Sequence, residues 1–167
     1  MMAQKSLLGP AVGTMIFTLM VPGTVVVLVP YLLSSGWTMG PPLLGWKGTQ
    51  WLGAIIGFIG SPMFVRFLLH FVTEGHGTPA PIAPTEQLVV GGPFRRVRNP
   101  GYIGVLAMVV GQGLFFGSAA VLAYATCLAI GFHLFVVFYE EPTLRRQFGT
   151  QYDEYCRRVP RWVPRLR

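Results

Sequence analysis

The stretch that decides the fold is Gly101–Tyr139, which reads GYIGVLAMVVGQGLFFGSAAVLAYATCLAIGFHLFVVFY. No charged residue occurs between Arg98 and Glu140. As one α-helix, the stretch would measure about 58 Å at 1.5 Å per residue, which is about twice the hydrocarbon thickness of a bilayer. It must therefore fold back, and Gly117-Ser118 predicts the turn of a tight helical hairpin.

The whole chain has the composition of a membrane protein. Of its 167 residues, 52% are hydrophobic and 11% are charged, against about 25% charged residues in a typical soluble domain. Since a span needs about 20 apolar residues, and backbone groups in lipid must bond to one another, we expect helices. The predicted fold is an all-α integral membrane protein with one membrane domain, residues 1–167, and four spans: Val12–Leu33, Trp51–Val72, Gly101–Phe116 and Ala119–Tyr139.

The ends of the chain and its connections carry the remaining features. The first apolar block exceeds the ~7–15 residue apolar core of a signal peptide, so we expect it to be retained as a span. Glycines 53, 57 and 60 form a small-residue stripe that predicts close helix packing. The two cysteines have no metal-ligand spacing, and we expect neither a metal site nor a nucleic-acid partner.

The distribution of Lys and Arg predicts the orientation. Four spans put the N-terminus, the loop 73–100 and the tail 140–167 on one side of the membrane. That side holds twelve of the thirteen basic residues, and the other side has only Lys47. By the positive-inside rule, we expect both termini in the cytosol, with the chain in the plasma or inner membrane if it is bacterial.

The loop and the tail hold most of the polar residues. Prolines and glycines of the loop predict irregular backbone. In the tail, apolar residues recur at spacings of 4, 4, 3 and 4, which indicates one face of an amphipathic helix that Gly149 interrupts: Leu144, Phe148, Tyr152, Tyr155 and Val159. Such a helix fits either a position on anionic lipid or a lid over the loop.

Charges of both signs meet in this arrangement. The predicted hairpin brings Arg98, before the third span, close to Glu140 and Glu141, after the fourth. Such a cluster suits a polar ligand that carries both charges, and it equally suits a salt-bridge network without a ligand. Asn99-Pro100 also fits a plain helix start, and the loop arginines fit membrane anchors.

Two strings in these segments resemble a known family. Gly92–Gly104, GPFRRVRNPGYIG, resembles the signature core of the isoprenylcysteine carboxyl methyltransferase and phospholipid methyltransferase superfamily, roughly Gly-Pro-aromatic-x-x-x-Arg-(His/Asn)-Pro-x-Tyr-x-Gly. About 40 residues later, a second string is similar to that family's glutamate pair followed by Leu, Phe-Gly and two tyrosines: Glu140-Glu141-Pro142-Thr143-Leu144, Phe148-Gly149, Tyr152 and Tyr155. The resemblance covers about Gly75 to Pro164.

The resemblance implies a methyltransferase that uses S-adenosylmethionine at the cytosolic membrane face. The cofactor-binding residues carried over from the two strings, with neighbouring loop residues added, are Gly92, Arg95, Arg98, Asn99, Pro100, Tyr102, Gly104, Glu140, Glu141 and Tyr152. We expect an arginine, Arg98 before Arg95, on the donor's carboxylate, and Glu140 or Glu141 on its ammonium or ribose hydroxyls. No catalytic base is assigned, although His76 and His133 are candidates for an amine acceptor.

The acceptor stays open at this point. The resemblance implies a lipophilic methyl acceptor that enters from the membrane lipid: a prenylcysteine-type carboxylate, a phospholipid amine, or a small hydrophobic thiol or acid. One alternative is an NADPH-dependent membrane reductase related to sterol reductases, and another is a non-enzymatic membrane protein of the same fold. The chain is short for the family and has Gly101 where bulkier residues are common.

Overall fold

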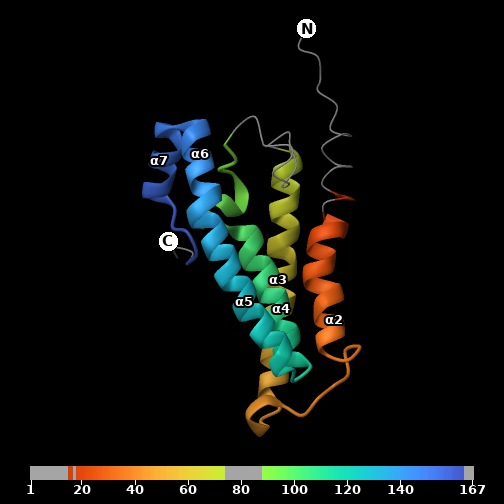
Figure 1. Cartoon of the computed structure of the whole chain (residues 1–167). Coiled ribbons are helices and arrows are strands. Elements are labelled where there is room, and N and C mark those ends of the chain that lie inside the picture. The colour runs from red at the N-terminus through yellow and green to blue at the C-terminus, as the bar shows by residue number, and fades with distance from the viewer. Residues whose placement is uncertain (1–14, 17, 74–87, 164–167) are drawn as a thin grey trace.

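The structure, a computed structural model, describes residues 15–16, 18–73 and 88–163. Within these residues every regular element is a helix and there is no strand (Figure 1). In chain order the elements are η1 (Gly23–Leu28), α2 (Val29–Leu33), η2 (Leu43–Gly45), α3 (Gly48–Thr73), η3 (Gly92–Arg95), α4 (Pro100–Phe115), α5 (Ala119–Phe135), η4 (Val136–Glu140), α6 (Glu141–Phe148) and α7 (Thr150–Arg158). Here η1 and η4 are π-helical, and η2 and η3 are 3₁₀ turns.

Two helices have the length and apolar character needed to cross a membrane. They are Gly48–His70 within α3 and the continuous helix Ala119–Phe148. Thr18–Leu33 and Pro100–Phe115 are apolar but shorter, so the count of four spans stays a prediction. The predicted start of the first span at Val12, and the predicted irregular loop at residues 74–87, lie outside the described residues.

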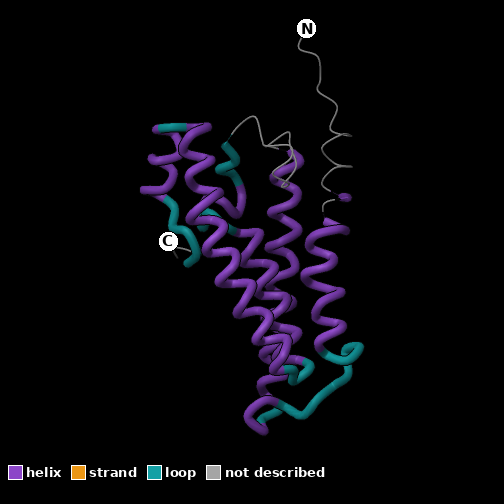
Figure 2. The backbone as a smooth tube through the Cα atoms, in the orientation of Figure 1, coloured by secondary structure: helices purple, strands orange, loops and turns teal. Residues whose placement is uncertain are grey.

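The predicted hairpin is confirmed between α4 and α5. α4 ends at Phe115, and α5 begins at Ala119 after a turn of three residues, visible at the lower end of the bundle in Figure 2. The hydroxyl of Ser118 accepts a hydrogen bond from the backbone N–H of Val121, which satisfies one of the free donors at the start of α5. The hairpin therefore returns the chain to the end of the bundle where α4 began.

The predicted glycine packing is confirmed along α3 and α4. A Cβ atom added to Gly53 would lie 2.5 Å from the backbone N of Phe115, and one added to Gly111 would lie 2.6 Å from the backbone N of Gly57. A Cβ atom on Gly60 would lie 2.7 Å from that of Ala107. The two backbones are thus in direct contact, as expected where helices associate through small residues in lipid. We call this contact the glycine seam.

A proline explains the π-helix η1 and its attachment to the bundle. Pro30 has no N–H, so the carbonyl of Val26, four residues earlier, loses its usual helical donor. The N–H of Val29 bonds to the carbonyl of Thr24, as in a π-helix, which leaves the carbonyl of Val25 without its α-helical donor. Side chains from the hairpin replace it: the hydroxyl of Tyr124 donates to Val25 at 3.2 Å, and the amide of Gln112 donates to Val26 at 2.9 Å. The first apolar helix is therefore bonded to both α4 and α5.

The tail differs from its prediction in two respects. The helix does not end at Tyr139, as predicted, but continues through η4 into α6, and the 30 residues of Ala119–Phe148 measure about 45 Å. Since hydrocarbon accounts for about 30 Å, α6 extends beyond it. The single amphipathic tail helix was also wrong, because Gly149, with φ +53° and ψ −129°, separates α6 from α7. In Figure 1, α7 folds back beside α6.

Candidate functional site

A short C-terminal segment returns to the bundle after α7. Residues 159–163, which we call the strap, run from the end of α7 towards the start of α4. The backbone N–H of Arg98 donates to the carbonyl of Pro160 at 2.9 Å, and the amide of Asn99 donates to the carbonyl of Arg161 at 3.1 Å. Segments more than 60 positions apart in sequence are thereby joined at one end of the helices.

Glu141 is the centre of a buried charge network. Its side chain is 4% exposed, and one carboxylate oxygen lies 3.0 Å from Nη1 of Arg98. Arg161 donates to both carboxylate oxygens, from Nε at 2.7 Å and from Nη2 at 3.0 Å, and Arg145 lies 4.0 Å away. Hydrogen bonds to Glu141 raise the pKa of Arg161 further above its ordinary value. Bidentate pairing of this kind offsets the desolvation of a buried carboxylate.

Arg98 lies between this network and α7. Its Nη1 is 2.7 Å from Sγ of Cys156, while its Nε is buried without a hydrogen-bond partner. Two tyrosines of α7 pack nearby, and burial raises the pKa of both phenols, Tyr152 and Tyr155. The hydroxyl of Tyr155 donates to the carbonyl of Phe94 at 2.8 Å and so attaches α7 to η3.

Glu140 has different neighbours from Glu141. It accepts one hydrogen bond, from the hydroxyl of Tyr102 at 2.8 Å. The ring of Tyr102 lies 4.7 Å from that of Phe132 and 6.5 Å from that of Trp162, as measured between centroids. Nε1 of Trp162 lies 3.2 Å from Nδ1 of His133. Glu140 is the last residue of the π-helix η4 and Glu141 the first residue of α6, and π-helical insertions of this kind occur often at functional sites.

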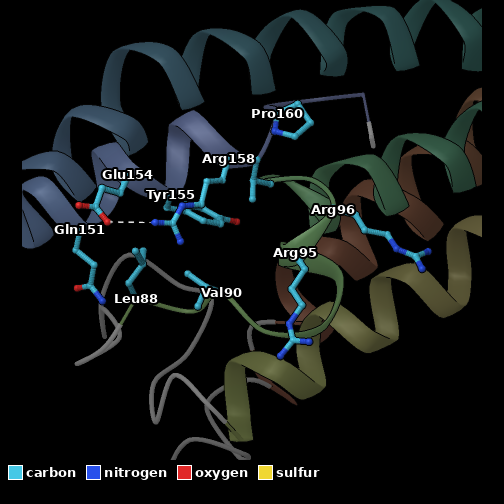
Figure 3. Close-up of a pocket in the computed structure, with 10 residues that line it drawn as sticks. Leu88, Val90, Arg95, Arg96, Gln151, Glu154, Tyr155, Arg158 and Pro160 are labelled. Carbon is cyan, nitrogen blue, oxygen red and sulfur yellow. Dashed lines mark ion pairs between the residues drawn. The ribbon is translucent and has the colours of Figure 1, made fainter. Parts of the chain in front are cut away.

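A cavity of about 590 Å³ lies between the segment 88–96 and α7, and no residue of the Glu141 network lines it (Figure 3). This volume is typical of a small-molecule site. Arg158 crosses the cavity towards Glu154, 3.5 Å away, whereas Arg95 and Arg96 extend away from that pair. The other lining residues are Leu88, Val90, Gln151, Tyr155, Val159 and Pro160.

The structure brings most of the sequence-predicted site residues to one end of the bundle. Arg98, Asn99 and Glu141 contact one another or the strap, Tyr102 bonds to Glu140, and Tyr152 is buried. The remaining four lie elsewhere at this end. Arg95 lines the cavity, Gly92 contacts His70, Pro100 is buried at the start of α4, and Gly104 faces Phe64 of α3.

Sequence reasoning missed the strap residues and Cys156. Arg161 supplies the bidentate partner of Glu141, and Trp162 covers the other side of Tyr102. The one available signal was Pro160, which cannot continue the preceding helix and so predicts a change of direction. His76 lies outside the described residues.

In the part of the chain that the structure describes, all regular elements are helices, and two of them are long and apolar enough to cross a membrane, as in an all-helical membrane protein. The chain belongs to the phospholipid methyltransferase family, whose model matches residues 50–151. The strap follows that range and is not part of the match.

Several characterised proteins are similar to the chain. "Protein-S-isoprenylcysteine O-methyltransferase B" of Arabidopsis thaliana is 37% identical over 47% of this chain and 40% of its own length. "Methanethiol S-methyltransferase 2" of Bradyrhizobium diazoefficiens is 32% identical over 71% of this chain and 45% of its own length. A mouse delta(14)-sterol reductase is 35% identical over 48% of this chain, but only 19% of its own length. The chain thus spans less than half the length of these relatives. No solved structure matches it.

Proposed function

We propose that this protein transfers a methyl group from S-adenosylmethionine to a lipophilic acceptor at the cytosolic face of the membrane. One observation carries the proposal. The two family strings, 38 or more positions apart in sequence, meet through the Tyr102–Glu140 hydrogen bond and the Arg98–Glu141 ion pair. Both contacts lie where apolar helices end. A cavity of ligand size opens between α7 and the segment 88–96, and none of these four residues lines it.

The charges at this end suit a methyl donor that carries a carboxylate, an ammonium and a sulfonium. Arg98 has a buried Nε without a partner, which is spare hydrogen-bonding capacity for an anionic group. Glu140 forms no ion pair with any residue that the structure describes, so it is available to a cationic group. The bound donor would supply an electrophilic methyl group.

The protein's own part in such a reaction is positioning. Methyl transfer is an in-line displacement, and holding two reactants in alignment accounts for most of the acceleration available to it. In our proposal Arg98, Asn99 and Glu140 orient the donor, while Tyr102 holds the Glu140 carboxylate. The strap excludes water from this end, because it covers the polar groups at the start of α4.

The acceptor class in the proposal follows from the relatives and from the helices. The two methyltransferase relatives are named for an isoprenylcysteine and for methanethiol. The exposed faces of the helices are apolar, for example at Phe58, 80% exposed, and Phe138, 75% exposed, so a lipophilic acceptor can approach through lipid. We therefore keep three acceptor types in the proposal: a prenylcysteine-type carboxylate, a phospholipid amine, and a small hydrophobic thiol or acid.

Calorimetry on the detergent-purified protein tests the donor assignment. S-adenosylmethionine and S-adenosylhomocysteine are expected to bind and NADPH is not. Binding of NADPH alone would instead favour a reductase, the reaction for which the mouse relative is named. Arg98→Ala is expected to weaken S-adenosylhomocysteine binding by roughly 1.5–3 kcal/mol, the scale of a hydrogen bond to a charged group. Arg157→Ala, exposed on α7, is the matched control and should leave binding unchanged.

A labelled-methyl assay on total lipid extract identifies the acceptor. A product that remains in the lipid phase supports a lipid acceptor, and the label's stability to mild base separates a methyl ester from a methylated amine. A volatile product indicates a small thiol. Label that enters none of these fractions, from a protein that binds the donor, would reject the proposed acceptor classes.

A further inference from the structure

The cavity between the segment 88–96 and α7 carries more positive than negative charge. Arg95 and Arg96 line it from the end of η3, and Arg158 lines it from α7 (Figure 3). Glu154 adds a carboxylate, so three arginines against one glutamate give the lining residues a net charge of +2. The exposed amide of Gln151 adds a neutral hydrogen-bond donor. These groups favour an anionic ligand.

The three arginines can turn to such a ligand without losing a strong contact. Arg95 and Arg96 are exposed and form no ion pair with any residue that the structure describes. Arg158 lies 3.5 Å from Glu154, but the two side chains are 78% and 59% exposed. Because exposed pairs of this kind contribute little to stability, an anion in the cavity can compete with Glu154 for Arg158.

Apolar groups form the rest of the cavity wall. They are contributed by both sides of the cavity: Leu88, Val90, Val159 and Pro160. At about 590 Å³ the cavity has the volume of a site for a whole small molecule, so it has room for much more than a single inorganic ion. Arginines next to an apolar wall suit an amphipathic anion, whose charged group binds the guanidinium groups while its carbon atoms contact the wall.

The cavity lies at the depth of lipid headgroups. The helix from Ala119 to Glu140 measures about 33 Å, close to the hydrocarbon thickness, and the Tyr102–Glu140 hydrogen bond puts the first turn of α4 at the same level. η3 comes just before α4, and the bond from the N–H of Arg98 to the carbonyl of Pro160 attaches the end of α7 there as well. Anionic lipids in a leaflet attract basic segments at this depth.

We propose that this cavity binds the phosphate of an anionic lipid headgroup. Arg95 and Arg96 contact the phosphate oxygens from one side and Arg158 from the other, since planar guanidinium groups bind phosphate through paired hydrogen bonds. The apolar wall contacts the glycerol carbons. A bound lipid thus links η3 to α7. The inference goes beyond the proposed function, because neither Arg98 nor Glu140 lines the cavity.

Three soluble probes test the ligand class on the protein purified in detergent, at constant ionic strength and without a methyl donor. They are dihexanoylphosphatidylglycerol, dihexanoylphosphatidylcholine and inorganic phosphate. A ligand that binds the folded state raises the melting temperature, and we expect this rise from the phosphatidylglycerol alone. An equal rise with phosphatidylcholine, which has the same chains but no net charge, would show that the arginines do not select the ligand. An equal rise with inorganic phosphate would assign the cavity to a free anion and overturn the lipid assignment.

Variants separate the cavity from the general positive charge of the tail. Arg158→Gln should weaken phosphatidylglycerol binding by about 10-fold, the scale of a hydrogen bond between charged groups, as a titration of the melting temperature measures. Arg158→Lys keeps the charge and should retain part of the affinity. Arg157→Gln is the matched control, because it removes the same charge from an exposed neighbour on α7 that does not line the cavity. Equal losses in Arg157→Gln and Arg158→Gln would reduce the site to non-specific attraction and refute it.

A variant of the opposite sign guards against a loss of fold. Glu154→Gln removes the negative charge from the lining and releases Arg158, so it should strengthen phosphatidylglycerol binding by about 3-fold. Without a probe, Glu154→Gln and Arg158→Gln should both melt like the wild type, because the pair that they break is exposed. If Glu154→Gln melts like the wild type but binds the lipid no more tightly, the phosphate does not lie between these arginines and the proposal fails.

Discussion

The glycine seam and the charge network join segments of the same bundle by opposite means. In the seam, Gly53 and Gly111 let two backbones touch directly. In the network, Glu141 depends on Arg98 and Arg161 from two other segments and on Arg145 of its own helix. The seam is therefore sensitive to any added atom, whereas the network is sensitive to any lost partner.

Loss of Glu141 should have the largest effect on stability. Glu141→Ala leaves Arg98 and Arg161 without their carboxylate, and breaking a buried pair costs about 3–5 kcal/mol. We expect the lower end, about 3 kcal/mol, because Arg161 is 32% exposed and so is partly screened by water. Unfolding in mixed detergent micelles measures the change in free energy.

The matched control is the exposed ion pair between Arg158 and Glu154, whose side chains are 78% and 59% exposed. Glu154→Ala should change the free energy of unfolding by no more than about 0.5 kcal/mol. Equal losses at the two glutamates would mean that the buried network adds nothing beyond an ordinary surface pair.

A larger residue in the seam should have the next largest effect. Gly111→Val places a Cβ atom 2.6 Å from the backbone N of Gly57, so the helices must separate, and overpacking of this kind costs about 2 kcal/mol. The melting temperature in detergent reports it. Gly131→Ala is the control, because no atom lies within 4 Å of the added Cβ and alanine is the better helix former. A seam that tolerates valine as well as Gly131 tolerates alanine would disprove the backbone contact.

The smallest effect is expected at the contact between α7 and η3. Tyr155→Phe removes the hydrogen bond to the carbonyl of Phe94 and should lower the free energy of unfolding by about 1 kcal/mol.

Burial raises the pKa of Tyr155, whereas an unfolded tyrosine loses its proton near pH ~10. The folded state then binds more protons, so wild-type stability should fall as the pH rises above about 10. The free energy of unfolding of the variant should fall less than that of the wild type between pH 8 and pH 10.5, where both are measured. An equal fall in the two proteins would contradict the burial of this phenol.

Local patterns predicted the parts of the structure that have local causes. The hairpin followed from an apolar stretch too long for one span, with Gly117-Ser118 near its middle. The seam followed from glycines at helical spacing, and the hairpin in turn predicted that Arg98 and Glu141 would meet. Each of these features depends on a periodicity or a length that can be read along the chain.

The tail shows where local patterns were insufficient. A helical spacing of apolar residues extends across Gly149, but a backbone with positive φ separates α6 from α7 at that residue. The fourth span was predicted to end at Tyr139, yet the helix continues, because proline is tolerated at Pro142 in the first turn of α6 after the π-helix η4. The contact that holds α7 against η3, the hydrogen bond from Tyr155 to Phe94, joins residues 61 positions apart and leaves no local pattern.

By itself, the sequence determined an all-helical membrane protein of this family, its hairpin, its seam and the end of the bundle that holds the charges. These features follow from hydrophobicity, residue size and the covalent order of the chain. Tertiary structure alone decided that Glu141 pairs with arginines, whereas Glu140 accepts a hydrogen bond from Tyr102. That difference depends on where the strap places Arg161 and Trp162. The contacts of the strap join residues some 20 to 60 positions apart, and no repeating pattern in the sequence indicates which residues pair over such separations.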